Sequence, residues 1–310
     1  MAAFPSTGRP ACLSVTHETA YRYASPVELA HHVAYLRPLE TPYQTLRDFE
    51  LQIEPRPSSC IDESDVYGNA RALFELLAPH DFLRVRAVSR VCVSPRFAGL
   101  DGAGGPPWEE AARRWRYVSG APYAPESEFV FASPYVPLHA PLRAYARESF
   151  TPGRGLVAAA VELMHRIHRD FTYESNSTAV STPLLEAFEA RHGVCQDFAH
   201  VAIGCLRALG LAARYVSGYL LSEPPPGQPR LVGADASHAW LSVYVPGLEA
   251  GGGWLDLDPT NDLIPGAAHV TLAHGRDYGD VTPLRGVIRG GGGHELQVAV
   301  TVEPDAGSPR

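Results

Sequence analysis

The sequence contains no lysine: all 26 of its basic residues are arginine, against 34 acidic residues. The resulting net charge of −8, with a pI near 5.9, argues against a surface built for nucleic acid or for an anionic membrane. A protein or peptide substrate of neutral or cationic character is the expected partner. The abundance of Ala, Gly and Pro indicates a coding bias that explains the missing lysines without selection for function.

Long hydrophobic runs are missing too, since no segment approaches the roughly 18 apolar residues of a membrane span. The first residues lack the charged-then-apolar order of a signal peptide, so we expect a cytoplasmic protein that contacts no membrane. Close cysteine pairs are absent as well, which favours free thiols in a reducing compartment over a disulfide framework. The scattered cysteines are Cys12, Cys60, Cys92, Cys195 and Cys205.

The first third of the chain has a β-like pattern instead. From residue 12 to about 94, apolar and polar residues alternate in short bursts, which predicts an antiparallel β module with one solvated face. VYGNA at 66–70 predicts a hairpin turn, and the Gly- and Pro-rich residues 98–107 mark a linker. The expected organisation is a β-rich domain over 1–97, a partly helical connector over 98–150, and a core over 151–310.

The second half predicts helices followed by strands. Apolar residues at helical spacing predict helices over 155–171, 182–191 and 195–209, with Thr182 as N-cap and Pro183 as first residue of the second helix. Three strand-like runs follow, ARYVSGYLL, SHAWLSVYVP and GGGWLDLDPT, and the tail ends in the alternating run HELQVAVTVEP. This order of elements predicts an α+β fold.

One cysteine, Cys195, stands at the start of a predicted helix. Unpaired N–H groups and the helix dipole stabilise an anion there, so the thiol can ionise and the same N–H groups can bind an oxyanion. A thiolate nucleophile needs a base, and the base needs an orienting acceptor. His238 opens one predicted strand and Asp258 ends the next, so antiparallel pairing can bring them together. Asp256 shares a strand face with Asp258, and the pattern leaves both open.

Four segments, GVCQDFAH, ALGLAARYVSGYL, SHAWLSVYVPG and GWLDLDPTN, resemble the core of the bacterial transglutaminase-like superfamily of papain-like thiol enzymes. LSVTHETAYRYASPVELAHHVAYLRP resembles the β-rich N-terminal domain of many bacterial members, and the run beginning HVTLAHGRDYGDV resembles their tail. The resemblance implies a papain-like core with Cys195 as nucleophile, His238 as general base and acid, and Asp258 as the residue that orients His238. Gln196 and Asp197 match the same block, and we expect them to shape the helix start beside the oxyanion site.

Three aromatic residues are further candidates for the substrate side. Tyr173 is a candidate for oxyanion or substrate binding, and Tyr219 and Trp240 either line a groove beside the triad or pack the core. Residues of metal-ligand type also gather in the same stretch: His192, Cys195, His200 and Cys205. Their spacing scatters them over different helix faces, so we expect neither a metal site nor a cofactor.

These residues predict acyl transfer through a thioester, in which Cys195 attacks an amide carbonyl and His238 protonates the leaving amine. Water would then make the enzyme a cysteine peptidase or amidase, and a primary amine would make it a protein-glutamine transglutaminase. The sequence leaves both open. A different class, a non-catalytic module whose papain-like groove holds a peptide, is the alternative. Nothing in the sequence indicates the oligomeric state.

Overall fold

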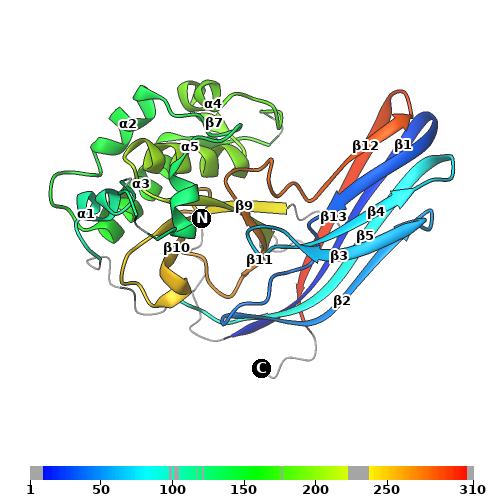
Figure 1. The fold of residues 1–310 in the computed structure, drawn as a ribbon, viewed down its shortest axis with the longest axis horizontal. Coiled ribbons are helices and arrows are strands. Elements are labelled where there is room, and N and C mark those ends of the chain that lie inside the picture. Colours follow the sequence, from blue (N-terminus) through cyan, green and yellow to red (C-terminus); the bar gives the residue numbers. More distant parts are fainter. Residues whose placement is uncertain are drawn as a thin grey trace, which may run out of the picture.

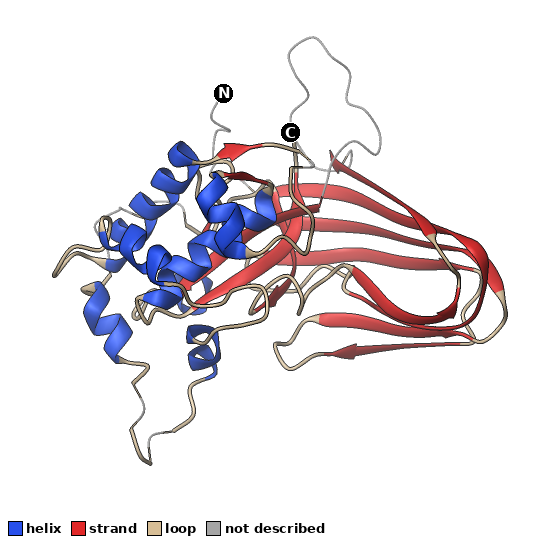
Figure 2. Cartoon of the chain, turned by 90° about the horizontal axis from the view of Figure 1, so that it is seen from above, coloured by secondary structure: helices blue, strands red, loops and turns tan. Residues whose placement is uncertain are grey.

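The computed structural model describes residues 10–97, 100, 105–116, 118–120, 122–175, 177–222 and 237–305. A helical lobe packs around a small sheet, and a long β arm extends from it (Figure 1). Seen from above, the helices gather at one end and the strands of the arm run away from them (Figure 2). Residues 98–99 and 101–104 of the predicted linker lie outside the described residues.

The β arm is held together by one long strand, β1. Its first half pairs with β5 (residues 11–22) and β13 (residues 13–23), whereas its second half pairs with β12 (residues 27–34) and β4 (residues 30–34). The sheet, with strand order β2-β5-β1-β4-β3, therefore folds over into two layers. The strands are β1 (Ala11–Ala34), β2 (Gln44–Glu54), β3 (Ser59–Ser64), β4 (Ala70–Leu76), β5 (His80–Val93), β12 (Leu284–Gly290) and β13 (His294–Pro304).

Alternation along β1 explains how the arm joins the helical lobe. Alternate residues of its first half point to one buried face. Near the lobe, Leu13 and Val15 on this face belong to the main hydrophobic core, together with Val91 of β5. Farther out, Leu83 and Val85 of β5 pack against the second layer. One sheet face thus serves both the core of the lobe and the core of the arm.

The lobe contains the predicted helices and a second antiparallel sheet, with strand order β10-β9-β8-β11. Helix α5 packs against β8 and β9. The strands are β6 (Thr172–Tyr173), β7 (His192–Gly193), β8 (Ala213–Leu220), β9 (Ser237–Tyr244), β10 (Trp254–Leu257) and β11 (His269–Gly275). The helices are α1 (Trp108–Arg113), α2 (Ala140–Arg147), α3 (Leu156–Asp170), α4 (Leu184–Ala190) and α5 (Cys195–Ala208), with 3-10 turns at Pro125–Val130 and Ala250–Gly253.

The predicted α+β fold with a β-rich N-terminal region is confirmed, with local differences. Helix α4 begins after Pro183, and the Thr182 hydroxyl accepts a hydrogen bond from the Ala179 N–H at 2.9 Å instead of capping the helix. The tail strands β12 and β13, assigned from the sequence to the core over 151–310, pair with β1 and lie in the arm. Strand pairing between the two ends of the chain leaves no local signal in the sequence.

The expectation that all cysteines are free is wrong. Cys12 and Cys92 lie opposite each other on β1 and β5 and form a disulfide. They are 80 residues apart in the sequence, so only the strand pairing reveals them as partners. Cys60 is an exposed free thiol on β3, and Cys205 is a buried one in α5.

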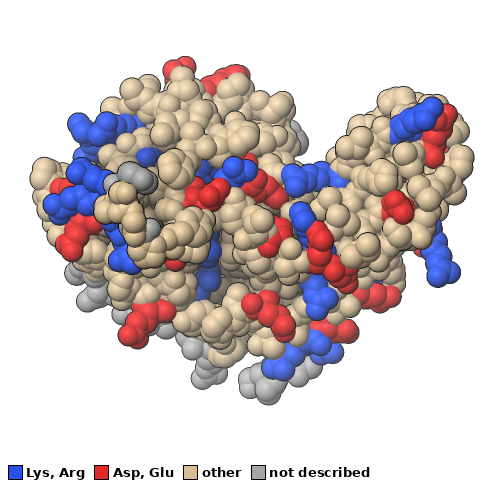
Figure 3. Space-filling view, in the orientation of Figure 1, with Lys and Arg blue, Asp and Glu red and all other residues tan. Residues whose placement is uncertain are grey.

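The charges are distributed rather than concentrated. Arginine and acidic side chains are interspersed over the lobe and the arm on the face that Figure 3 shows. Among the described residues, no helix is both long enough and apolar enough to cross a bilayer.

Candidate active site

Cys195 is the first residue of α5, and the turn before it is tightly fixed. The Val194 N–H donates to Asp197 Oδ2 at 2.8 Å, and the Thr178 hydroxyl donates to the same oxygen at 2.6 Å. A Cβ at Gly193 would lie 2.6 Å from that carboxylate oxygen, so glycine is needed for this close approach. Asp197 therefore fixes the helix start, and the partly exposed Cys195 is reachable from solvent.

His238 is the second residue of β9 and contacts both Cys195 and Asp258. Its Nε2 lies 2.7 Å from Asp258 Oδ2, and the Cys195 side chain is also a hydrogen-bond partner of the ring. With Nε2 engaged by Asp258, Nδ1 is the ring nitrogen left for the thiol. The three predicted triad residues are thus brought together in the order thiol, imidazole, carboxylate.

The Asp258 carboxylate is fully buried and surrounded by donors. Oδ1 accepts from the backbone N–H groups of Thr260 at 3.0 Å and Asn261 at 3.2 Å. Oδ2 accepts from Asn261 Nδ2 at 2.8 Å and meets Nε2 of His269, a residue of β11, at 3.1 Å. Sequence reasoning missed Asn261 and His269. Asn261 stands in the quoted motif GWLDLDPTN, where its proximity to Asp258 was a usable signal.

Opposing effects set the protonation states of His238 and Asp258. Burial alone would lower the pKa of His238, but the Asp258 charge and the bonds from Asp258 and Cys195 outweigh it and raise the pKa to about 10. Burial would raise the pKa of Asp258, but the charge and hydrogen bond of His238 and the bond from His269 hold it well below its usual range. At neutral pH the pair is therefore an imidazolium beside a carboxylate.

Asp256, the alternative that the strand pattern left open, lies elsewhere. It forms an ion pair with Arg96. It also accepts hydrogen bonds from the Ser242 hydroxyl at 2.6 Å and from Trp240 Nε1 at 3.2 Å. Asp258, and not Asp256, contacts His238.

The aromatic candidates differ in position. Tyr173 is half-exposed and pairs with Gly193, two residues before Cys195, and burial raises its pKa. Tyr219 and Trp240 do not line an open groove, because both are buried. The Tyr219 hydroxyl lies 2.9 Å from Nδ1 of His17 in the β arm. The Trp240 ring packs beneath the site, its centroid 5.2 Å from that of His269.

Three further residues near Cys195 serve local structure. Gln196 donates from Nε2 to the Val180 carbonyl at 3.3 Å, on the same loop as the Thr178 hydroxyl. Buried His200 accepts from the Tyr278 N–H at 3.2 Å. His192 is partly buried, and its Nδ1 lies 4.0 Å from Glu174 Oε2. These contacts give His192 and His200 roles in packing and surface structure.

A different group among the described residues has the composition of a metal site. Ligand-type atoms of His238, Asp258 and His269 lie within 4.8 Å of one another, and all three side chains are buried. The Nε2 atoms of both histidines are already engaged with Asp258 Oδ2. The hydrogen bonds account for this convergence without an ion.

The loop after Asp258 is anchored from behind by α3. His168 Nδ1 lies 3.1 Å from the Thr260 carbonyl, and His165 Nδ1 contacts Asp262 Oδ1. Asp262 adopts a left-handed conformation with φ of 56°. The two helix histidines thus hold the turn that supplies backbone donors to Asp258.

Comparisons with known proteins agree with this architecture. Residues 13–92 match the family described as the bacterial transglutaminase-like N-terminal region, and residues 143–259 match the transglutaminase-like superfamily. An uncharacterized protein of Mycobacterium tuberculosis is 44% identical over 276 residues, covering 88% of this chain and 86% of that protein.

Two further matches are to proteins whose names describe an activity. A protein-glutamine gamma-glutamyltransferase of Pseudomonas aeruginosa is 32% identical over 138 residues, covering 42% of this chain and 20% of that protein. The crystal structure of a candidate cysteine protease from Cytophaga hutchinsonii matches with a TM-score of 0.72 at 20% identity, covering 97% of this chain and 93% of that one. This likeness establishes a shared fold, and the matches together support a thiol-dependent enzyme in general terms. The chain belongs to the transglutaminase-like superfamily and carries its bacterial N-terminal region.

Proposed function

We propose that this protein catalyses acyl transfer from amide bonds through a thioester on Cys195. His238 serves as general acid and base, and Asp258 orients it. The observation that carries this proposal is the contact of His238 with both the Asp258 carboxylate and the helix-start thiol of Cys195. A binding module would need no such pairing of a buried imidazole and carboxylate.

In the first step the Cys195 sulfur bonds to the amide carbonyl carbon, and the carbonyl oxygen becomes an oxyanion. Backbone N–H groups at the start of α5 are positioned to stabilise this oxyanion. The carbon–nitrogen bond then breaks, and the His238 imidazolium donates its proton to the leaving nitrogen. Neutral His238 takes the proton of the second nucleophile, which attacks the thioester and releases Cys195.

Thiol reactivity tests the proposed nucleophile. We expect iodoacetamide at neutral pH to alkylate Cys195 at least ten times faster than Cys60, the exposed free thiol of the arm. His238→Ala should reduce this rate, and Cys60→Ser, the matched control, should leave it unchanged. Equal rates at the two cysteines in the wild-type protein would contradict the proposal.

The identity of the second nucleophile, water or an amine, distinguishes hydrolysis from acyl transfer. A library of glutamine-containing peptides is incubated with and without a primary amine, and masses are measured. Incorporation of the amine supports a transglutaminase, whereas cleavage, or a gain of about one dalton from deamidation, supports hydrolysis. Cys195→Ala should abolish either product, with a loss of about 10⁴-fold or more. A binding module would yield no product with the wild-type protein.

A further inference from the structure

A pocket of about 440 Å³ lies at the end of the central sheet remote from the triad. Arg214, which lines it, pairs with Ser242 on β9, whereas His238 pairs with Gly218 near the other end of β8. The volume falls within the range of roughly 300–1,000 Å³ that is typical of small-molecule sites. Elements of both lobe and arm line the pocket, including Tyr67 of the β3–β4 turn and Trp254 of β10.

Its apolar wall is a set of aromatic rings in fixed mutual contact. The Phe129 and Trp254 rings meet edge to face with centroids 5.3 Å apart, and Tyr67 lies 5.3 Å from Phe129. Tyr123, which is largely exposed, stands at the pocket as well. Such a wall suits a flat or branched apolar group of a ligand.

Two buried nitrogens of the pocket have no hydrogen-bond partner within the part of the chain that the structure describes. The Arg214 guanidinium stacks on Trp254, with Cζ 4.2 Å from the ring centroid, and its buried Nε has no hydrogen-bond partner. Nδ1 of His274 is likewise buried without one. Burial and the charge of Arg96 outweigh the opposing charge of Glu126 and lower the pKa of Arg214 to about 9, which leaves it a cation at neutral pH. Burial and the charge of Arg214 keep the pKa of His274 well below its ordinary value, so this ring is neutral.

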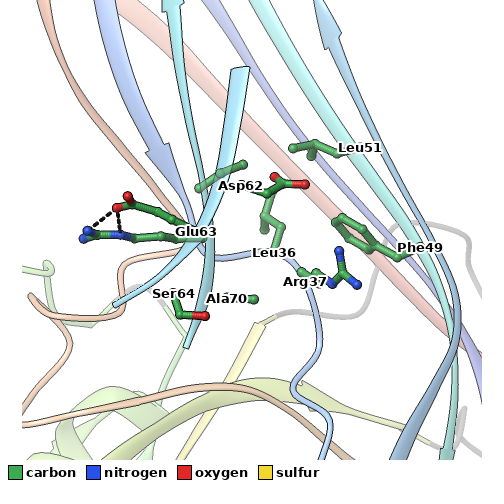
Figure 4. A pocket seen from close by; sticks show the side chains of 11 residues that line it. Leu36, Arg37, Phe49, Leu51, Asp62, Glu63, Ser64 and Ala70 are labelled. Carbon is green, nitrogen blue, oxygen red and sulfur yellow. Dashed lines mark hydrogen bonds and ion pairs between the residues drawn. The ribbon is translucent and has the colours of Figure 1, made fainter. Parts of the chain in front are cut away.

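A second pocket, in the β arm, provides the contrast. It has a volume of about 330 Å³ and lies between β2 and β3 (Figure 4). There the Arg71 Nε donates to Glu63 Oε1 at 2.7 Å, and the Arg37 guanidinium lies over the Phe49 ring. The Arg71 cation is already ion-paired within its own pocket, whereas the Arg214 guanidinium forms no hydrogen bond or ion pair with a described residue, although the charge of Glu126 in the same pocket acts on it.

An unpaired guanidinium fork matches a carboxylate or a phosphate. Two acidic side chains, Glu126 and Glu128, also line the pocket and would repel a multiply charged phosphate. We propose that this pocket binds a small α-amino acid zwitterion with an apolar side chain, whose carboxylate pairs with Arg214 and whose ammonium group faces Glu126 and Glu128. The aromatic wall takes the apolar side chain, and the site is separate from the proposed acyl-transfer centre.

Isothermal titration of the full chain with L-phenylalanine tests the proposal. L-phenylalanine should bind saturably, and L-phenylalaninamide, which lacks the carboxylate, should bind at least ten times more weakly. N-acetyl-L-phenylalanine, which lacks the ammonium group, should also bind more weakly. Absence of saturable binding of L-phenylalanine, or equal binding of either analogue, would overturn the proposal.

Two variants locate the binding. Arg214→Gln should weaken L-phenylalanine binding at least tenfold, whereas Arg71→Gln, the matched control in the arm, should not change it. Arg214→Gln breaks no hydrogen bond to a described residue, so we expect it to fold, which circular dichroism checks. Glu126→Gln should weaken binding of L-phenylalanine and leave that of N-acetyl-L-phenylalanine unchanged. Unaltered L-phenylalanine binding in Arg214→Gln, or in Glu126→Gln if Arg214→Gln does not fold, would refute the assignment.

Discussion

At the scale of single residues, the chemistry of the site depends on keeping one buried carboxylate charged. Asp258 accepts backbone, amide and imidazole donors at once, and a buried carboxylate without them would take up a proton. Among these donors, His269 comes from β11, which is the edge strand opposite β10 in the sheet. We therefore assign it as a positioning residue that acts on His238 through Asp258.

His269→Leu should lower kcat about tenfold, because losing one hydrogen bond to a buried charged group costs about 1–3 kcal/mol. It should also shift the acidic limb of the pH–rate profile to higher pH, because Asp258 loses a hydrogen-bond donor that favours its charged form. His269→Gln retains a side-chain N–H and should restore most of the activity. His32→Asn, which changes a buried histidine of the arm, is the control. Equal activity of His269→Leu and wild type would remove His269 from the site.

His238 makes a pH-dependent contribution to stability. Its pKa is raised in the folded protein to about 10, above the ordinary value of 6.5, so the folded state binds the proton more tightly than the unfolded state. The stabilisation is complete below pH 6.5 and is lost as pH rises to about 10. The difference in unfolding free energy between wild type and His238→Gln should therefore shrink over this interval, as measured by urea denaturation. A constant difference would indicate that His238 is neutral when folded.

At the scale of elements, α5, the strand β9 that carries His238 and the strand β10 that ends just before Asp258 could be predicted because their signals are local. Apolar periodicity marks α5, and Pro259, which cannot donate to a strand ladder, follows soon after the end of β10. His269 could not be found in this way, because a loop of irregular spacing separates it from Asp258. The alternation pattern could not predict the burial of Trp240 either. It places Trp240 on the same strand face as His238 but does not tell whether that face is covered.

The turn before α5 gives a prediction about its one glycine. Gly193→Ala puts a methyl group 2.6 Å from Asp197 Oδ2, so the carboxylate that holds the helix start must move. We expect a loss of about 1–3 kcal/mol in unfolding free energy and a slower alkylation of Cys195. Gly266→Ala is the control, since no atom lies within 4 Å of the added Cβ. Equal effects of the two substitutions on both readouts would contradict this account of Gly193.

At the scale of the whole molecule, the features that sequence reasoning missed are pairings between distant segments. The return of β12 and β13 to β1 and the Cys12–Cys92 disulfide both arise from strand pairing across the chain. Thiol titration of the protein in denaturant should give three free thiols without reductant and five after reduction. Reduction should also lower the unfolding free energy, by roughly 2–4 kcal/mol, because the disulfide restricts the unfolded chain. Five titratable thiols before reduction would disprove the pairing.

The arm is fastened to the lobe by two side-chain amides that bond to β11 as a further strand would. Gln44 accepts from the Thr271 N–H and donates to its carbonyl, both at 2.8 Å. Asn69 makes the same pair of bonds to His274, both at 2.7 Å. Both amides are buried, so removing Gln44 takes the partner from the Thr271 N–H, whose carbonyl keeps the Leu39 N–H at 3.1 Å, and removing Asn69 takes the side-chain partners from the N–H and carbonyl of His274.

Gln44→Ala and Asn69→Ala should each lower the unfolding free energy by about 1–3 kcal/mol. Gln52→Ala, which removes an exposed amide from the same strand as Gln44, should have little effect. Because β11 also carries His269, loosening its edge should lower kcat in both variants, an effect that arm stability alone would not cause. If Gln44→Ala matched Gln52→Ala in urea denaturation and in kcat, the amide would not fasten the arm. If it lost stability but kept full activity, β11 would hold His269 in place without the arm.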